Sequence, residues 1–225
     1  FRSASARTGH DIVLHRNNVD GKGASWGTHE NYMMLRSVPF DTVAALMTAH
    51  FVSRQIYAGS GRVGIGERSE TAGYQLSQRA DYIHAILGLQ TTFERPIVNT
   101  RDESHSPSDY RRLHVIVGDA NRMDVPQTLK LGATSMLLWL AEHADETGYD
   151  LAALLDSMAL VDPVSAMHTV SHDLTLQAEL PLRDGGVTNA WIMQVRLRAA
   201  VYEMGALVYG TDTRGEPLWP DKPTT

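Results

Sequence analysis

The sequence predicts an α+β fold in which one face of a sheet carries helices and the other face lines a polar groove. Several short segments of mixed polarity occur in the first half of the chain, as expected for strands with one solvated face. Longer segments with apolar residues at helical spacing separate and follow them. A chain of 225 residues is also long enough to bury a substantial core.

Five segments are the strand candidates. They cover residues 11–15, 28–35, 74–77, 95–99 and 112–117. In the second of these, the two-residue period of a strand places Glu30, Tyr32 and Met34 on one face. A polar, turn-rich run at 104–109 leads into the last strand, which ends at Gly118.

Four segments are predicted helices because their apolar residues recur at helical spacing. They cover residues 39–57, 126–144, 151–160 and 190–208. The apolar stripe of the second helix is Leu129, Ala133, Met136, Leu137 and Leu140, and that of the last is Ile192, Val195, Leu197, Val201 and Met204. A helix or irregular segment is expected at 79–87, and a hairpin at 180–187 turns through Asp184-Gly-Gly.

The segment from Gly59 to Gly66 matches the pattern G-x-G-x-x-G. A dinucleotide-binding site requires a strand before this pattern and a helix after it. Here a predicted helix comes first and further polar residues follow. We therefore expect a flexible loop at this position.

The composition excludes several classes of protein. A formal charge of −6 argues against a nucleic-acid-binding protein, and no apolar run reaches the roughly 18 residues of a membrane span. The absence of cysteine excludes thiolate metal sites. No segment resembles a signal peptide, so a cytoplasmic location is expected. The abrupt ends suggest a fragment or a processed chain.

Residues 112–116 carry the first candidate chemistry. Leu113 and Val115 should pack on helices, whereas Arg112, His114 and Ile116 share the opposite face. A guanidinium binds phosphate and an imidazole can ligate a metal. The alternative is an edge strand whose polar face meets water.

A second pair of histidines has the spacing of metal ligands on one helix face. His168 and His172 are four residues apart. No third ligand is evident nearby, so surface or packing roles are favoured for both.

Four stretches together resemble the Pup ligase and depupylase family, whose partner Pup is a small disordered protein modifier. The stretches are Asn17-Asn-Val-Asp-Gly-Lys-Gly-Ala-Ser-Trp-Gly-Thr-His-Glu-Asn-Tyr32, Leu76-Ser-Gln-Arg-Ala-Asp81, Asn99-Thr-Arg-Asp-Glu-Ser-His105 and Tyr110-Arg-Arg-Leu-His-Val-Ile-Val-Gly-Asp-Ala-Asn121. The resemblance implies a glutamine-synthetase-like fold of the carboxylate-amine ligase type, with a mainly antiparallel curved sheet and helices on one face. It also implies dependence on ATP and magnesium.

Within that family, residues 18–23 and 59–66 look most like the depupylase branch. The implied activity is hydrolysis of the isopeptide bond between the C-terminal glutamate of Pup and a substrate lysine, or of the C-terminal glutamine side-chain amide of Pup. Pup ligase activity is the alternative within the enzyme class. A catalytically silent module that binds Pup or nucleotide, or one half of a split enzyme, is the alternative outside it.

The resemblance also implies site residues. It makes Glu30 and His114 magnesium ligands and Arg112 a contact of the nucleotide phosphates. It places Arg101 near the phosphates or the Pup carboxylate, and Tyr32 near the nucleotide. An imidazole on magnesium is unusual by general coordination rules and is expected here only because the resemblance implies it.

Two further expectations follow from the resemblance. The family begins with a Glu-x-Glu magnesium strand and a strand bearing the catalytic aspartate, and both would precede Phe1. Residues 1–225 are therefore expected to form a partial domain without an assignable nucleophile and without the small C-terminal domain, and a second chain could supply the missing strands. A groove lined by Arg101, Arg111 and Arg112 is expected to attract the carboxylates of an acidic, partly disordered peptide, and the resemblance implies Pup and pupylated proteins as partners.

Overall fold

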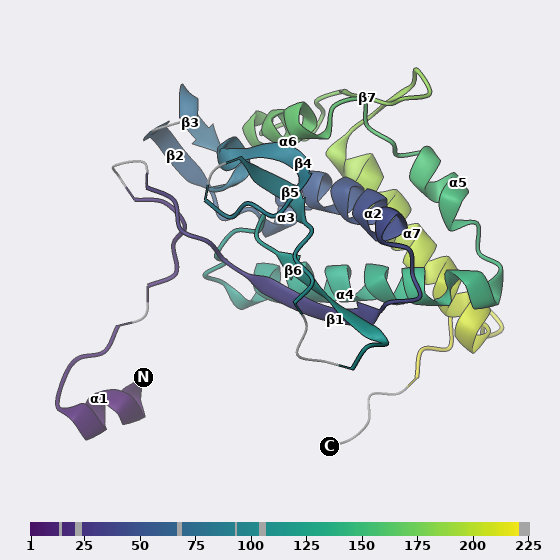
Figure 1. The fold of residues 1–225 in the computed structure, drawn as a ribbon, viewed down its shortest axis with the longest axis horizontal. Coiled ribbons are helices and arrows are strands. Elements are labelled where there is room, and N and C mark those ends of the chain that lie inside the picture. Colours follow the sequence, from purple (N-terminus) through teal and green to yellow (C-terminus); the bar gives the residue numbers. More distant parts are fainter. Residues whose placement is uncertain (14, 21–23, 67–68, 93, 104–106, 221–225) are drawn as a thin grey trace.

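A two-stranded antiparallel ribbon of β1 (Glu30–Leu35) and β6 (Tyr110–Val115) lies at the centre of the molecule (Figure 1). In the computed structural model it pairs Glu30 with Val115, Tyr32 with Leu113 and Leu35 with Tyr110. The structure describes residues 1–225 except 14, 21–23, 67–68, 93, 104–106 and 221–225. Both strands were expected from their two-residue periodicity, and both are confirmed.

The other described strands also pair two by two. β2 (Arg62–Gly66) and β3 (Ser69–Gln75) form an antiparallel hairpin, β4 (Ile83–Gly88) and β5 (Arg95–Asn99) are parallel, and β7 (Leu180–Pro181) and β8 (Val187–Thr188) are antiparallel. β5 lies beside β6 without a shared ladder of hydrogen bonds. The α+β class is thus confirmed, but the described strands do not join into the single curved sheet that was expected.

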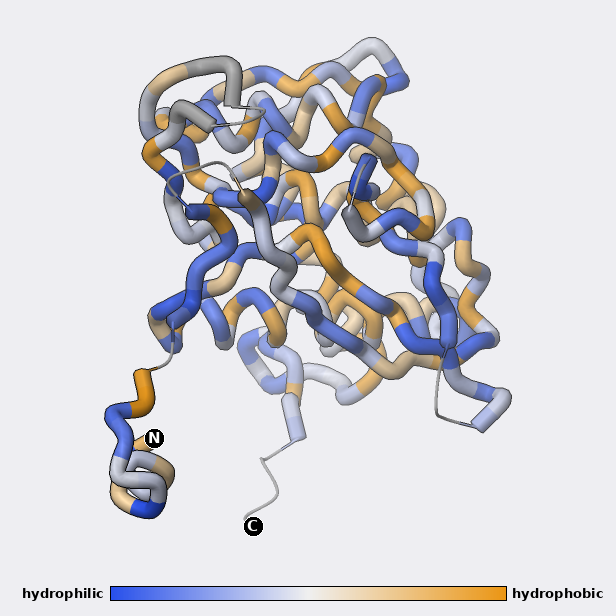
Figure 2. The backbone as a smooth tube through the Cα atoms, turned by 60° about the vertical axis from the view of Figure 1, so that its left-hand side comes forward, coloured by the Kyte–Doolittle hydropathy of each residue, from blue (hydrophilic) through white to orange (hydrophobic). Residues whose placement is uncertain are grey.

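The helices lie mainly on one side of these strands (Figure 1). They are α1 (Arg2–Thr8), α2 (Phe40–Ser53), α3 (Gln55–Ala58), α4 (Asp124–Thr147), α5 (Leu151–Asp156), α6 (Pro163–His172) and α7 (Ala190–Tyr209), with a 3₁₀ turn, η1, at Ala80–Tyr82. α2, α4 and α7 contact one another, and α4 also contacts β1. By contrast, α1 stands apart from the body and buries none of its residues (Figure 2). Among the described residues, no helix is both long and apolar enough to cross a membrane.

The core forms where α2, α4 and α7 meet. Leu46, Met47 and Phe51 of α2 are buried, as their spacing predicts. The segment 39–57, predicted as one helix, forms two helices. Arg54 is the C-cap of α2 and the N-cap of α3. Leu140 of α4 is buried as expected.

Two of the predicted apolar stripes contain errors. Leu129, near the start of α4, is 49% exposed. In α7, Leu197 and Met204 are buried as predicted, but Ile192 and Val195 are exposed, because the buried stripe begins at Met193. That stripe is Met193, Leu197, Ala200 and Met204.

Three segments adopt a different secondary structure from the predicted one. Residues 11–13 and 15 are irregular instead of forming a strand, and residue 14 lies outside the described part. Residues 79–87 contain η1 and most of β4, a strand that the sequence did not predict. The glycine-rich segment 59–66 enters the β2–β3 hairpin, where Val63 pairs with Tyr74. The expected flexible loop was therefore wrong for residues 62–66, which form β2, and a strand follows the pattern where a dinucleotide site requires a helix.

Two other expectations are confirmed. His168 and His172 have packing roles, since the His168 ring lies 2.9 Å from the Ile83 carbonyl oxygen and His172 lies 3.1 Å from an Asp81 carboxylate oxygen. The hairpin around Asp184 forms as β7 and β8. Of the predicted polar run at 104–109, residues 104–106 lie outside the described part.

Candidate functional site

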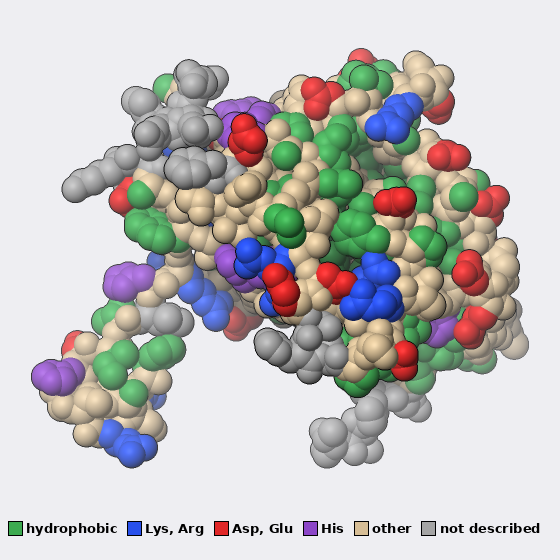
Figure 3. Space-filling model, in the orientation of Figure 1, with side chains coloured by type: hydrophobic (Ala, Val, Ile, Leu, Met, Phe, Trp, Pro, Cys, Tyr) green, Lys and Arg blue, Asp and Glu red, His purple; other side chains and the backbone are tan. Residues whose placement is uncertain are grey.

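The two faces of the β1–β6 ribbon carry different chemistry. On β1 the side chains of Glu30, Tyr32 and Met34 are buried, while Asn31 and Met33 between them are exposed. Residues directly opposite each other in an antiparallel pair share a face. Histidine and charged side chains gather over this part of the front face in Figure 3.

The register decides which β6 residues join the exposed face. Asn31 lies opposite His114, which is buried beneath its neighbours on this face, and Met33 lies opposite Arg112. The predicted sharing of one face by Arg112 and His114 is therefore confirmed, with Asn31 as their neighbour across the ribbon.

An outer cluster forms on this exposed face. It consists of His29, Asn31, Arg101, Glu103, Arg112 and His114. The His114 Nδ1 atom lies 2.9 Å from Asn31 Oδ1, and Arg112 Nη1 lies 3.4 Å from the same oxygen. The rings of His29 and His114 meet edge to face with centroids 4.9 Å apart.

Glu103 joins the two arginines of the outer cluster. Its Oε2 lies 3.3 Å from Arg112 Nη2 and 3.7 Å from Arg101 Nε. The Glu103 side chain is 71% exposed, so solvent screens these ion pairs and their contribution to folding stability is small. A phosphate would compete with Glu103 for both guanidinium groups.

The imidazoles of the outer cluster are neutral at pH 7. Burial, then the neighbouring His29 and the Arg112 and Arg101 guanidinium groups, lower the pKa of His114 to about 4. Burial, Arg79 and Arg101 also lower the pKa of His29. The positive charge of the cluster therefore comes from its arginines, and His114 keeps a lone pair that can bind a metal.

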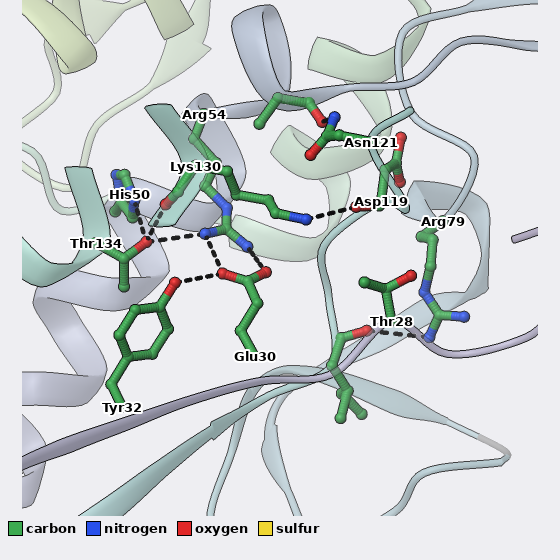
Figure 4. Close-up of polar contacts among 12 residues, drawn as sticks. Thr28, Glu30, Tyr32, His50, Arg54, Arg79, Asp119, Asn121, Lys130 and Thr134 are labelled. Carbon is green, nitrogen blue, oxygen red and sulfur yellow. Dashed lines mark hydrogen bonds and ion pairs between the residues drawn. The ribbon is translucent and has the colours of Figure 1, made fainter. Parts of the chain in front are cut away.

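On the buried face of the ribbon, Glu30 forms an ion pair with Arg54 (Figure 4). Arg54 Nη2 lies 2.7 Å from Glu30 Oε1 and Nη1 lies 3.1 Å from Oε2. The Tyr32 hydroxyl donates to the same Oε2 at 2.6 Å, and burial raises the Tyr32 pKa, so the phenol stays protonated. Arg54 also donates to Thr134 Oγ1, 2.9 Å away, which His50 Nε2 approaches to 3.0 Å. Both carboxylate oxygens of Glu30 are thus committed inside the protein.

The predicted magnesium ligands Glu30 and His114 are consequently not brought together. They lie on opposite faces of the ribbon, and among the described residues no group of three His, Asp or Glu side chains is placed to hold a metal. His114 fits one ligand position, because its Nε2 is buried and has no hydrogen-bond partner in the described part of the chain. Glu30 does not fit in this arrangement, because Arg54 neutralises it.

The predicted nucleotide contacts are divided in the same way. Arg101 and Arg112 meet in the outer cluster, whereas Tyr32 lies on the buried face. Arg111 also points away from the outer cluster, because its Nη2 donates to the Arg36 carbonyl at 3.0 Å and its guanidinium stacks on Phe40. The expectation that Arg101, Arg111 and Arg112 line one groove was wrong for Arg111.

Asp119, at the end of the 110–121 stretch, binds residues of the segments 59–66 and 76–81 (Figure 4). Its carboxylate accepts hydrogen bonds from Ser77 Oγ at 2.9 Å and from the backbone N–H groups of Ser60 and Gln78 at 2.8 and 2.9 Å. Lys130 Nζ donates to the Asp119 carbonyl at 2.6 Å. Asp119 therefore ties loops to α4, and this role is structural.

Two other motif residues complete this junction. Arg79 donates to the carbonyls of Trp26 and Ile116, the latter at 3.1 Å, and the Asn18 side chain accepts from the backbone N–H of Ala120. The junction holds Asn18 and Trp26 against the end of β6, next to the outer cluster.

Several residues of the outer cluster and of the network around Glu30 were not among the predicted site residues. They are His29, Asn31, His50, Arg54, Glu103 and Thr134. Asn31 could have been found only from the register of the ribbon, which periodicity within one strand does not give. Arg54 follows a helix and is 24 residues from Glu30, and no local pattern links the two.

Comparisons with known proteins show what this chain is similar to. The family model described as "Pup-ligase protein" matches residues 1–217. A protein named "Pup deamidase/depupylase" from Mycolicibacterium smegmatis is 52% identical over 184 residues, which cover 81% of this chain and 35% of the relative. A "Pup--protein ligase" from Kocuria rhizophila is 40% identical over 84% of this chain and 41% of that protein.

Two solved structures are also similar. The Pup ligase PafA in complex with ADP aligns with a TM-score of 0.71 and 33% identity over 90% of this chain and 43% of PafA. PafA in complex with Pup aligns with a TM-score of 0.67 and 33% identity over 84% of this chain and 36% of that chain. The chain thus spans less than half the length of each of these proteins.

Proposed function

Because this chain belongs to the Pup-ligase protein family, we propose that it forms the nucleotide-binding part of an ATP- and magnesium-dependent depupylase and Pup deamidase. The reaction would be hydrolysis of the isopeptide bond between the C-terminal glutamate of Pup and a substrate lysine, or of the C-terminal glutamine side-chain amide of Pup. The 52% identity to the relative named for deamidation and depupylation supports the hydrolase. The Pup ligase is the second candidate, since a relative and the similar structures carry that name.

The outer cluster is the observation that carries this proposal. Arg101 and Arg112 converge on the single carboxylate of Glu103, an exposed group that a nucleotide phosphate can replace. The neutral ring of His114 lies beside them. ADP in the similar PafA structure supports a nucleotide as the ligand.

Magnesium enters this proposal together with the nucleotide. Two guanidinium groups beside His114 disfavour a free divalent cation, so an ion should bind there only when phosphates offset the arginines. His114 would then be a ligand from this chain through Nε2, and the ion would neutralise phosphate charge. The roles predicted for Glu30 and Tyr32 would require them to leave the Arg54 network, and we do not include them.

Pup and pupylated proteins are the proposed macromolecular partners, supported by the complex of PafA with Pup. Arg101 and Arg112 would attract acidic side chains or the Pup carboxylate to the same face. The glutamine-synthetase-like architecture, the partial-domain organisation and the cytoplasmic location stay predictions.

Nucleotide binding is tested by calorimetric titration of the chain with ADP and magnesium. Arg112→Ala should weaken binding at least about tenfold, because a charge-assisted hydrogen bond contributes roughly 1.5–3 kcal/mol. Arg111→Ala is the matched control, since it removes the same charge from the neighbouring residue on the other face. We expect its effect to stay within about twofold. Equal losses in the two variants would contradict a phosphate site at Arg112.

Glu103→Gln provides an independent check of the competition argument. Removal of the negative charge of Glu103 should strengthen ADP binding, because both arginines are then free to bind phosphate. Weaker binding of ADP to this variant would show that Glu103 holds the arginines in place for the nucleotide and does not compete with it.

The reaction is tested in a hybrid protein. The matched 184 residues of this chain would replace their counterpart in the Mycolicibacterium smegmatis relative. Loss of Pup from a purified conjugate, followed on a gel, supports the hydrolase. Formation of conjugates from Pup and a free substrate protein would favour the ligase, and a hybrid that performs neither reaction while remaining folded would refute both.

A further inference from the structure

We propose that Asn31 is a positioning residue that fixes the tautomer of His114 and the direction of Arg112 at the same time. This inference deepens the proposed function, because it assigns a role to an exposed amide between the two groups expected to bind the nucleotide and its ion. The evidence is the sharing of one amide oxygen by an imidazole and a guanidinium.

Strand pairing places Asn31 between its two partners. It lies directly opposite His114, and the next outward residue on β1, Met33, lies opposite Arg112. Directly opposed side chains are close enough to bond, and diagonal neighbours are within reach of a long side chain. Asn31 can therefore contact both residues from a single rotamer.

The guanidinium determines which way the amide points. Arg112 has only donor groups, so the atom of Asn31 that faces it at 3.4 Å must be the oxygen. The same oxygen lies 2.9 Å from His114 Nδ1. Since this oxygen accepts only, Nδ1 must carry the proton of the neutral ring.

The other ring nitrogen of His114 is then unprotonated. Nε2 is buried and has no hydrogen-bond partner among the described residues. A nitrogen in this state can bind a cation or accept a hydrogen bond, but it cannot donate one to phosphate. Asn31 thus makes His114 a ligand, and leaves phosphate binding to the arginines.

The test compares Asn31→Leu, which removes the amide at similar size, with Asn31→Asp, which keeps an acceptor at the same place. Met33→Leu is the control on the same strand and face. The first readout is the ¹⁵N spectrum of the His114 ring without any ligand, which distinguishes the two tautomers. The second is the affinity for ADP with and without magnesium.

The protein and the Met33→Leu variant should show Nδ1 protonated and Nε2 unprotonated. Asn31→Leu should show a mixture of tautomers and bind ADP about three- to tenfold more weakly, as expected when Arg112 loses one hydrogen bond. Asn31→Asp should retain the Nδ1-protonated form.

An Nε2-protonated ring in the unaltered protein, or an unchanged tautomer in Asn31→Leu, would overturn the inference. The spectrum needs no nucleotide. If ADP does not bind while the tautomers behave as stated, the proposed function fails and the positioning role stands.

Discussion

Acidification should destabilise this protein through His50, a histidine that lies in the core. Its side chain is inaccessible to solvent, and its Nε2 lies 3.0 Å from Thr134 Oγ1. The Thr134 hydroxyl donates to the Lys130 carbonyl at 2.9 Å, so it must accept from His50 and from Arg54. Protonation of His50 would place a second buried cation beside Arg54.

The sign and size of the effect follow from proton linkage. Burial and the Arg54 charge lower the pKa of His50 well below its ordinary value of 6.5. Below that pH the unfolded chain binds a proton that the folded chain does not, so the free energy of unfolding falls as the pH falls. Between pH 7.5 and 5.5 the loss from His50 alone should be about 1.4 kcal/mol.

The assay is urea unfolding of the protein and of His50→Gln at pH 7.5 and 5.5. The glutamine amide can still donate to Thr134 but does not titrate. His29 and His114, whose pKa values are also lowered, contribute a loss of the same sign in both proteins, so the difference between the two isolates His50. His10→Gln, at an exposed position, controls for a change of histidine alone.

We expect the His50→Gln variant to lose about 1.4 kcal/mol less over this range than the unaltered protein. Equal losses in the two proteins would refute a neutral buried His50. If the free energy of unfolding of His10→Gln fell between pH 7.5 and 5.5 by as little as that of His50→Gln, the effect would not be specific to the core position.

Two further predictions concern the buried ion pair and its surroundings. Glu30→Gln should lower the free energy of unfolding by roughly 3–5 kcal/mol, because it leaves Arg54 buried without a counter-charge. The control, Asp102→Asn, breaks an exposed ion pair and should lower it by less than about 1 kcal/mol. Similar losses in the two variants would contradict a buried ion pair at Glu30. Gly118→Ala should lower the free energy of unfolding by more than about 2 kcal/mol, since its Cβ would lie 2.4 Å from a Glu30 carboxylate oxygen. The control, Gly132→Ala, adds a Cβ in open space on α4 and should raise the free energy of unfolding by about 0.5–1 kcal/mol. Thermal and urea unfolding measure all four, and a neutral Gly118→Ala would show that the pair can shift at little cost.

The sequence was sufficient to predict the two central strands and the sharing of a face by Arg112 and His114. Both follow from the period of a single strand. It was not sufficient to place Glu30, because the face on which a strand residue lies relative to a neighbouring strand depends on the pairing between them. Glu30 and His114 each matched a family role, but the register separates them.

Two other errors arise in single elements, a strand and a helix. The segment Ile83–Gly88 became a strand because it pairs with β5, a contact between distant residues that its own composition does not indicate. On α7, apolar residues such as Ile192 and Val195 occur outside the buried stripe, so spacing alone gave two possible faces. Helical spacing therefore does not identify the buried face of a helix that is apolar on more than one face.

The buried pair of Glu30 and Arg54 also has a consequence for strand slippage. A shift of β1 along β6 by one residue would turn Asn31 and Met33 inward and expose Glu30. Arg54 would then lie in the core without its counter-charge, which would destabilise the shifted alignment by several kcal/mol. The buried ion pair thereby favours the one alignment in which Asn31 lies opposite His114. Ligand preference can then change by substitution on the exposed side of the ribbon while its alignment is preserved.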